Sequence, residues 1–376
     1  MTRLVLVGAG HAHALVLRGW ADQPLAGVEL TIVSPQPLAP YSGMVPAWLG
    51  GTLDFDALCI DFAPLARAAG ARLIVDEVLR LDTAQRQLHL GSGAVLGWDQ
   101  LSLNIGSTLR PPALSGPRVL ALRPLADLQQ RWTALLAELA DEARGAAANL
   151  PLRITAVGGG AAGVESLLAV CARLRALLPQ RPLQPRLLAR SARLLPGLAP
   201  GAARAALAAL RRAGAEVQTN TDWHSADAAD SDLLLWATGA QAHAWPREAG
   251  LAAGDGGFVQ VDDRLRSVSH PRVHAAGDCA QWTPAQPKSG VLAVRMGPVL
   301  LHNLRAACGH GNTRVWEPPP RTLALLNTAD GRAIAAWGPL ALQGRWAMRW
   351  KDRIDRAFVA GFSAKADAPG PTPPAP

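Results

Sequence analysis

The sequence has little tyrosine, lysine and cysteine, and it has no long apolar run. No stretch of about 18 apolar residues occurs, although 49% of the residues are hydrophobic, so we expect no membrane-spanning helix. The cysteines are scattered without a CxxC or CxxxxC pair, which excludes a zinc site or a redox disulfide of the usual local form. We therefore expect buried, reduced thiols at Cys59, Cys171, Cys279 and Cys308.

Charge is also sparse. Charged residues make up only 18% of the chain, a proportion typical of a globular protein with a large core. The formal net charge of +8 favours anionic partners, and we expect nucleotide cofactors or an acidic membrane surface in that role, with no nucleic acid. The first strand leads at once into a glycine turn and leaves no room for a signal peptide, so we expect a cytoplasmic protein.

A repeat organises the chain. Residues 4–10 read LVLVGAG and residues 154–160 read ITAVGGG, and each run precedes an Ala- and Leu-rich segment with helical periodicity. Each half also has a later apolar strand, LSLNIGS at 101–107 and LLLWATGA at 233–240. Two strand–glycine–helix units, each with a matching closing strand, predict two dinucleotide-binding domains.

Strands and helices alternate between these landmarks, which predicts an α/β fold with two Rossmann-like dinucleotide-binding domains. We expect three layers, mostly parallel sheets and a small C-terminal region with an amphipathic helix. Further strands are expected at 28–33, 72–82, 186–189 and 216–219, and helices at 11–20, 56–69, 121–146, 161–178, 201–213 and 290–306.

The first glycine turn predicts a phosphate site. Gly8 permits the tight turn, Gly10 lets a pyrophosphate approach the backbone, and the helix that starts at His11 and Ala12 offers free N–H groups. The third glycine position holds His13, so either the helix stands off or the histidine faces outward. Histidines at i and i+2 of a helix face different directions, so we expect no metal site here.

The ribose end of this site is also incomplete. The usual acid at the end of the second strand is missing, and Ser34 would bind a ribose hydroxyl only weakly. A third element supports the site, because a later strand ends in Gly277-Asp278, where the carboxylate can accept a hydrogen bond from a ribityl hydroxyl. With Gly106 at the end of the closing strand, these residues predict FAD.

The second turn carries the intact fingerprint. Gly158, Gly160 and Gly163 hold all three glycine positions, and Gly239 ends the closing strand. This site is predicted to bind NADH or NADPH.

The next strand ends in basic residues. Arg190 and Arg193 stand where an acid would bind the ribose of NADH, and their guanidinium groups suit a 2′-phosphate. The sequence therefore favours NADPH without excluding NADH.

Hydride transfer to a flavin requires alignment more than acid–base chemistry. A helix that starts near Gly290 and Val291 is placed to stabilise negative charge on a flavin, and Lys288 would add a cation. Pro298 is expected to kink or split this helix.

The order of these motifs resembles the pyridine nucleotide-disulfide oxidoreductase superfamily, and within it the type II NADH dehydrogenase-like branch. The opening GAGHAH, PYSGM at 40–44, PKSGV at 287–291 and GRW at 344–346 resemble a bacterial subfamily that occurs alone or fused N-terminal to selenide, water dikinase. The resemblance covers residues 1–362 and implies FAD, NAD(P)H and a position for Glu165 near the nicotinamide.

The resemblance leaves the electron acceptor open. Related quinone reductases carry glutamines where Arg295 and Met296 stand, which counts against a quinone. Sulfide–quinone enzymes need paired cysteines, and only Cys279 is close to a flavin motif. We expect an FAD-dependent oxidoreductase that takes hydride from NAD(P)H and passes electrons to a quinone or another small acceptor. The alternative is a flavin-binding redox sensor, or a partner in selenium metabolism, with little turnover.

The C-terminal region predicts a basic amphipathic helix. Aromatic or aliphatic residues recur every four residues at Trp346, Trp350, Ile354, Phe358 and Phe362, with arginines between them. Residues 344–362 either attach the protein to the inner face of the cytoplasmic membrane or dock over the flavin domain or a homodimer interface, and we favour docking.

These assignments divide the chain into four ordered segments and a tail. The FAD-binding domain comprises 1–115 and 247–330, the NAD(P)-binding domain 116–246, the C-terminal region 331–362, and a disordered tail 363–376.

Overall fold

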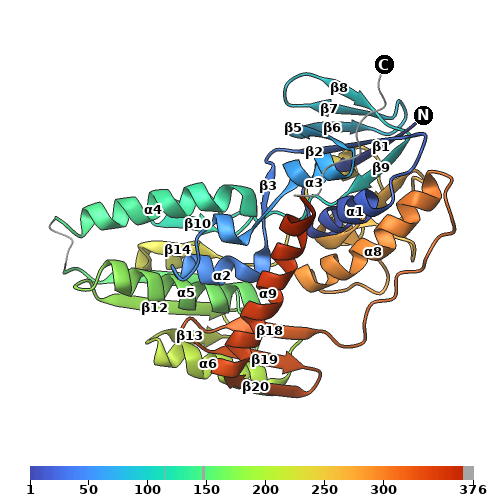
Figure 1. The fold of residues 1–376 in the computed structure, drawn as a ribbon. Helices are drawn as coiled ribbons and strands as arrows, with labels where there is room; N and C mark the ends of the chain where they lie inside the picture. The colour runs from blue at the N-terminus through green and yellow to red at the C-terminus, as the bar shows by residue number, and fades with distance from the viewer. Residues whose placement is uncertain (115, 146–148, 367–376) are drawn as a thin grey trace.

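The structure, a computed structural model, describes residues 1–114, 116–145 and 149–366 (Figure 1). It contains two parallel five-stranded sheets, and the predicted α/β fold with two Rossmann-like domains is confirmed. The strands of the first sheet are, in order, β16 (Val273–Ala275), β9 (Gln100–Leu103), β1 (Thr2–Val7), β2 (Val28–Ser34) and β5 (Arg72–Val75).

The second sheet repeats this plan. Its strands are, in order, β10 (Arg118–Ala121), β14 (Leu233–Trp236), β11 (Leu152–Val157), β12 (Leu183–Ala189) and β13 (Glu216–Thr219). In each sheet the strand before the glycine turn is central, so both turns lie at the carboxyl edge of a parallel sheet, where nucleotides bind in this architecture. The domain boundaries themselves stay a prediction.

Smaller antiparallel units cover these sheets. They are β6 (Val78–Asp82) with β7 (Gln87–Leu90) and β8 (Val95–Gly97), β18 (Leu323–Asn327) with β19 (Ala333–Trp337) and β20 (Leu340–Gly344), and the pair β3 (Leu38–Pro40) and β4 (Cys59–Asp61). A short parallel pair joins β15 (Val259–Gln260) to β17 (Ala280–Gln281).

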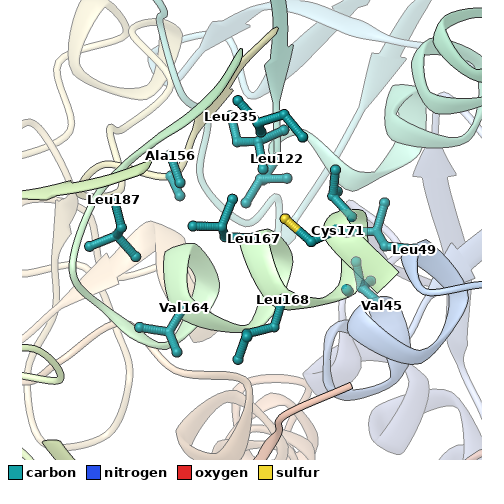
Figure 2. Close-up of a cluster of buried hydrophobic side chains, with 14 of the residues drawn as sticks. Val45, Leu49, Leu122, Ala156, Val164, Leu167, Leu168, Cys171, Leu187 and Leu235 are labelled. Atoms are coloured by element: carbon teal, nitrogen blue, oxygen red, sulfur yellow. The ribbon is translucent and has the colours of Figure 1, made fainter. Parts of the chain in front are cut away.

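The helices fill the layers around the sheets. They are α1 (His11–Asp22), α2 (Val45–Leu49), α3 (Phe62–Ala68), α4 (Leu128–Glu142), α5 (Ala161–Leu177), α6 (Pro200–Arg212), α7 (Trp245–Glu248), α8 (Gly290–Ala307) and α9 (Arg345–Ala366). Helix α5 is buried on all sides from Gly163 to Cys171, and Figure 2 shows Leu167 and Cys171 pointing toward Ala156 and Leu235 of the second sheet. In Figure 1, α9 (red) runs from the sheet β18–β20 toward α1 and α3.

Several predicted boundaries are wrong. Residues 59–61 of the predicted helix 56–69 form strand β4, because they pair with β3. The predicted helix 121–146 begins only at Leu128, after strand β10. Gly344, the first residue assigned to the amphipathic helix, ends strand β20 instead. Residues 363–366 continue α9, so the predicted tail begins too early. The rest of that tail, 367–376, lies outside the described residues.

Candidate functional site

The first glycine turn is held by a side chain that the sequence did not single out. Asn104, buried at the end of β9, accepts hydrogen bonds at Oδ1 from the backbone N–H groups of Ala12 (3.1 Å) and His13 (3.3 Å). Its Nδ2 donates to the carbonyl of Ala276 at 2.6 Å. A Cβ at Gly10 would lie 2.1 Å from Asn104 Oδ1, so only glycine lets this contact form. The structure thus brings β1, β9 and β16 together around one amide.

His13 occupies the third glycine position and points inward, so the outward alternative is wrong. Its Nδ1 lies 2.7 Å from the carbonyl of Gly8, and its Nε2 lies 2.8 Å from the hydroxyl of Ser102. A carbonyl only accepts, so Nδ1 carries the proton and Nε2 accepts from Ser102. Burial lowers the pKa of His13 to about 4, and the ring is neutral at pH 7.

Asp278 lies at the same edge of the first sheet, in a short 3-10 helix after β16. Its Oδ2 accepts from Arg123 Nη1 at 2.6 Å and from Ser107 Oγ at 3.4 Å, and Arg123 also contacts Ser107. Arg123 comes from the connection between β10 and α4, so the second sheet contributes a cation here. Gly106 lies directly before Ser107, while Ser34 is buried at the end of β2.

Among the described residues, no such side chain lies across the second glycine turn. A Cβ at Gly163 would lie 1.9 Å from the carbonyl of Gly158, which explains why glycine is required there. At Gly160 a Cβ would meet no atom within 4 Å, and no side chain caps α5. The first residues of α5, Ala161 and Ala162, are exposed, and this open helix start suits a diphosphate. Gly239, after β14, is also exposed.

The end of β12 is basic and open. Arg190 and Arg193 are exposed, and their guanidinium groups make no hydrogen bond or ion pair with the described part of the chain. Between them, the hydroxyl of Ser191 donates to the carbonyl of Arg193 at 2.8 Å.

Helix α8, which follows Gly277-Asp278 in the chain, is continuous through Pro298, so the predicted split is wrong. The side chain of Ser289 caps the start of α8. Gly290 lies so close to Ser42 that a Cβ on it would be 2.9 Å from the Ser42 hydroxyl oxygen. Val291 is exposed.

Lys288, just before this helix, donates to the carbonyl of Ala280 and lies 3.9 Å from the centroid of the Phe258 ring. Burial lowers the pKa of Lys288. A role of this ammonium at the flavin stays a prediction.

Glu165 lies on α5, two residues past the third glycine. Its Oε1 accepts from the backbone N–H of Asn327 at 2.6 Å, and burial raises its pKa to about 7, against the opposing effect of Lys351. Lys351 Nζ itself donates to Asp355 at 2.7 Å and to the carbonyl of Gly43 at 2.6 Å, and both α9 side chains are buried. A cluster of ionisable groups therefore lies between α5, β18 and α9.

Tyr41 connects this cluster to the first glycine turn. Its pKa is raised by burial and by the nearby carboxylate of Asp355. The ring of Tyr41 stacks edge-on against His11, the first residue of α1, with centroids 5.2 Å apart, and lies 4.8 Å from Phe358. Burial lowers the pKa of His11 to about 4. Residues next to the two glycine turns thus lie close together under α9.

The thiols show no sign of activation. Burial raises the pKa of Cys279 to about 11, and its Sγ donates to the carbonyls of Leu103 and Ala276. Cys59 and Cys308 are only partly buried, so the expectation of four buried thiols is wrong for these two. Met296 Sδ accepts from the backbone N–H of Gly277 at 3.1 Å.

The apolar stripe of α9 divides into two halves. Trp346, Trp350 and Ile354 are at least 40% exposed, whereas Phe358 is partly buried and Phe362 is buried. Each step of four residues turns about 40° beyond a full circle, so the stripe winds from solvent into the core. Among the described residues, no helix has the length and hydropathy that crossing a bilayer requires.

This fold and these paired turns define a two-dinucleotide oxidoreductase. A family model described as pyridine nucleotide-disulphide oxidoreductase matches residues 2–297, and the chain belongs to this family. It is 26% identical over 299 residues to an NADH dehydrogenase-like protein of Mycobacterium tuberculosis, covering 74% of this chain and 73% of that protein. The predicted type II NADH dehydrogenase-like resemblance is confirmed, whereas the fusion to selenide, water dikinase stays a prediction.

Two solved structures share the fold over nearly the whole chain. Sulfide:quinone oxidoreductase from Aquifex aeolicus has a TM-score of 0.76 and 13% identity, covering 98% of this chain and 93% of that one. NDH2 of Plasmodium falciparum in complex with NADH has a TM-score of 0.75 and 14% identity, covering 98% and 99%. Proteins of this family depend on FAD and use NAD(P)H, so the chain is an FAD-dependent NAD(P)H oxidoreductase.

Proposed function

We propose that the protein takes hydride from NAD(P)H at the second glycine turn and delivers the electrons through FAD to a small acceptor beside α9. The observation that carries the proposal is the junction under α9. There Glu165, which follows the second turn, and Tyr41, which packs on the first, both face Lys351 and Asp355.

The residues present fit both cofactors. The start of α5 at Gly160 has no side-chain cap, as a diphosphate site requires. At the start of α1 the N–H groups of Ala12 and His13 already donate to Asn104, so the contact to a diphosphate there falls to the backbone of Gly10 and His11. Asp278 supplies an acceptor for a ribityl hydroxyl, because Oδ1 makes no hydrogen bond within the described chain. When bound, the flavin takes up the hydride and releases the electrons to the acceptor.

The ionisable cluster handles the proton that accompanies the electrons. Glu165 is protonated below about pH 7, so it can hold a proton in a site shielded from water. Lys351 and Asp355 neutralise each other and fix Tyr41 at the edge of the site.

A quinone is the first acceptor to test, and the buried thiol of Cys279 argues against sulfide as a substrate. NADPH is the proposed reductant of preference, since Arg190 and Arg193 present free cations at the adenosine end.

Anaerobic mixing of the FAD-loaded protein with NADPH or NADH tests the function. Rapid bleaching of the flavin absorbance with either nucleotide, followed by reoxidation on addition of a soluble quinone, is the expected result. A flavin that neither nucleotide bleaches would contradict the enzyme and support the redox sensor. Bleaching without reoxidation by quinones would remove the quinone but leave the enzyme, and a screen of small acceptors then follows.

We also propose that the exposed half of α9 contacts an anionic membrane. Large apolar side chains gather here and on the hairpin β19–β20, with exposed fractions between 40% and 65%, at Trp337, Leu340, Leu342, Trp346, Trp350 and Ile354. Exposed arginines on α9, Arg345, Arg349, Arg353 and Arg356, add the charge that attracts acidic lipid.

Vesicle flotation tests this contact. The wild-type protein should float with anionic vesicles and not with zwitterionic ones, and replacing Trp346 and Trp350 by serine should abolish flotation. Self-association through the same face is the alternative. It predicts a dimer in sedimentation experiments that the same substitutions dissociate, with no vesicle binding.

A further inference from the structure

An ion pair between Arg123 and Asp278 joins the two domains. Arg123, in the connection after β10 of the second sheet, donates to Asp278 Oδ2 at 2.6 Å. The same guanidinium contacts the hydroxyl of Ser107, which follows the closing strand of the first sheet. The side chain of Asp278 is 15% exposed and that of Arg123 is 31% exposed, so water screens this pair only in part.

The geometry of this pair differs from that of the two-pronged arginine–aspartate pairs in the chain. Arg153 binds both carboxylate oxygens of Asp232, at 3.2 Å from Nε to Oδ2 and 2.8 Å from Nη2 to Oδ1, and Arg3 binds Asp99 in the same two-pronged way. Arg123 holds only Oδ2 of Asp278. Within the described chain Oδ1 accepts nothing, so one oxygen is fixed and the other is left for a ligand.

Electrostatics explains why an arginine is needed here. A dinucleotide brings two negative phosphate charges to the helix start at Gly10, and an unpaired carboxylate at the same sheet edge would repel them. A guanidinium in direct contact with the carboxylate offsets that repulsion.

We propose that Arg123 is a positioning residue of the flavin site: it neutralises Asp278 and fixes the carboxylate so that the free oxygen accepts a ribityl hydroxyl of FAD. The second domain thereby takes part in holding the cofactor of the first. The inference rests on the proposed function only in its use of FAD.

The test is a titration of flavin-free protein with FAD, followed by the change in flavin fluorescence, with no turnover involved. Arg123→Met should raise the Kd for FAD about 10-fold or more, the size expected for a lost charge-assisted hydrogen bond. Arg123→Lys should restore part of the affinity. Arg153→Met removes a comparable ion pair in the second domain and should leave the Kd unchanged.

A double variant separates an effect on the position of Asp278 from a general loss of stability. In an Asp278→Asn background, Arg123→Met should have little further effect on the Kd, because the partner it positions has lost its charge. If Arg123→Met does not fold, the comparison of Arg123→Lys with the wild type decides, and equal Kd values overturn the inference. Equal Kd values for Arg123→Met and the wild type overturn it as well. Tight FAD binding without bleaching by NAD(P)H contradicts the proposed enzyme alone, and a wild-type chain that binds no FAD contradicts both proposals.

Discussion

The two glycine turns start from the same backbone plan and are finished in opposite ways. In the first, His13 fills the third glycine position and Asn104 ties the start of α1 to the strand ends β9 and β16. In the second, Gly163 keeps the tight turn and the first residues of α5 remain open to solvent. We infer that the first turn retains a resident cofactor, while the second lets its nucleotide exchange in every catalytic cycle.

The largest expected effect on the reaction comes from a substitution that breaks the second turn. Gly163→Ala places a Cβ 1.9 Å from the Gly158 carbonyl, so the start of α5 must move away from the diphosphate. We expect kcat/KM for NAD(P)H to fall at least about 100-fold, which corresponds to about 2.7 kcal/mol. Stopped-flow flavin reduction measures this effect, and the FAD content is the internal control. Loss of FAD together with reduction would mean that the two turns are not independent.

The two domains also differ in the charge of the residue two positions after the third glycine position. Glu165 occupies the second position after the third glycine, and the equivalent residue of the first domain is the apolar Leu15. Burial raises the folded pKa of Glu165 from its ordinary 4.5 to about 7. The ionised form therefore destabilises the fold: the stability present below about pH 4.5 is lost as the pH rises through 7.

Glu165→Gln tests this assignment. Relative to the wild type, the variant should gain on the order of 3 kcal/mol between pH 4.5 and pH 8, since each pKa unit corresponds to about 1.4 kcal/mol. Urea unfolding at pH 5 and pH 8 gives the difference, with the exposed Glu138→Gln as the matched control. A gain that is the same at both pH values would place the titration elsewhere.

The next effect concerns the first turn. Asn104→Ala removes hydrogen bonds to three backbone groups, so we expect a loss of about 2 kcal/mol in unfolding free energy and a weaker hold on FAD. Asn303→Ala is the matched control, because this buried amide also bonds three backbone groups, at Arg264 and Arg314, away from either turn. Equal FAD affinity in the two variants would deny Asn104 a role in the cofactor site.

The sequence predicted what depends on local spacing. Glycines two residues apart after an apolar strand specify the turn and the helix start, and both turns lie where the repeat placed them. The sequence-based prediction failed where strand pairing decides the structure. Residues 59–61 stand in a segment with a helical pattern, but they pair with strand β3. The position of His13 was also ambiguous, because its buried partner Ser102 is 89 residues away.

The residues that complete the site were missed for the same reason. Arg123 and Asp278 are 155 residues apart, and Lys351 bonds a carbonyl 308 residues earlier. No periodicity within a segment carries such contacts. One local signal existed for Asn104: it is an amide at the end of a predicted strand, and a buried amide there requires backbone partners.

The smallest expected effect sharpens the comparison at the open turn. Arg190→Ala removes a free guanidinium from the end of β12, and we expect kcat/KM for NADPH to fall about 10-fold while that for NADH is unchanged, since only the 2′-phosphate uses the charge. Arg211→Ala, which deletes an exposed arginine at the end of α6 in the same domain, controls for net charge. Equal losses for both nucleotides would assign Arg190 to the shared diphosphate. No loss for either would leave the selection of the nucleotide to Arg193, because it is the remaining free cation on the same connection.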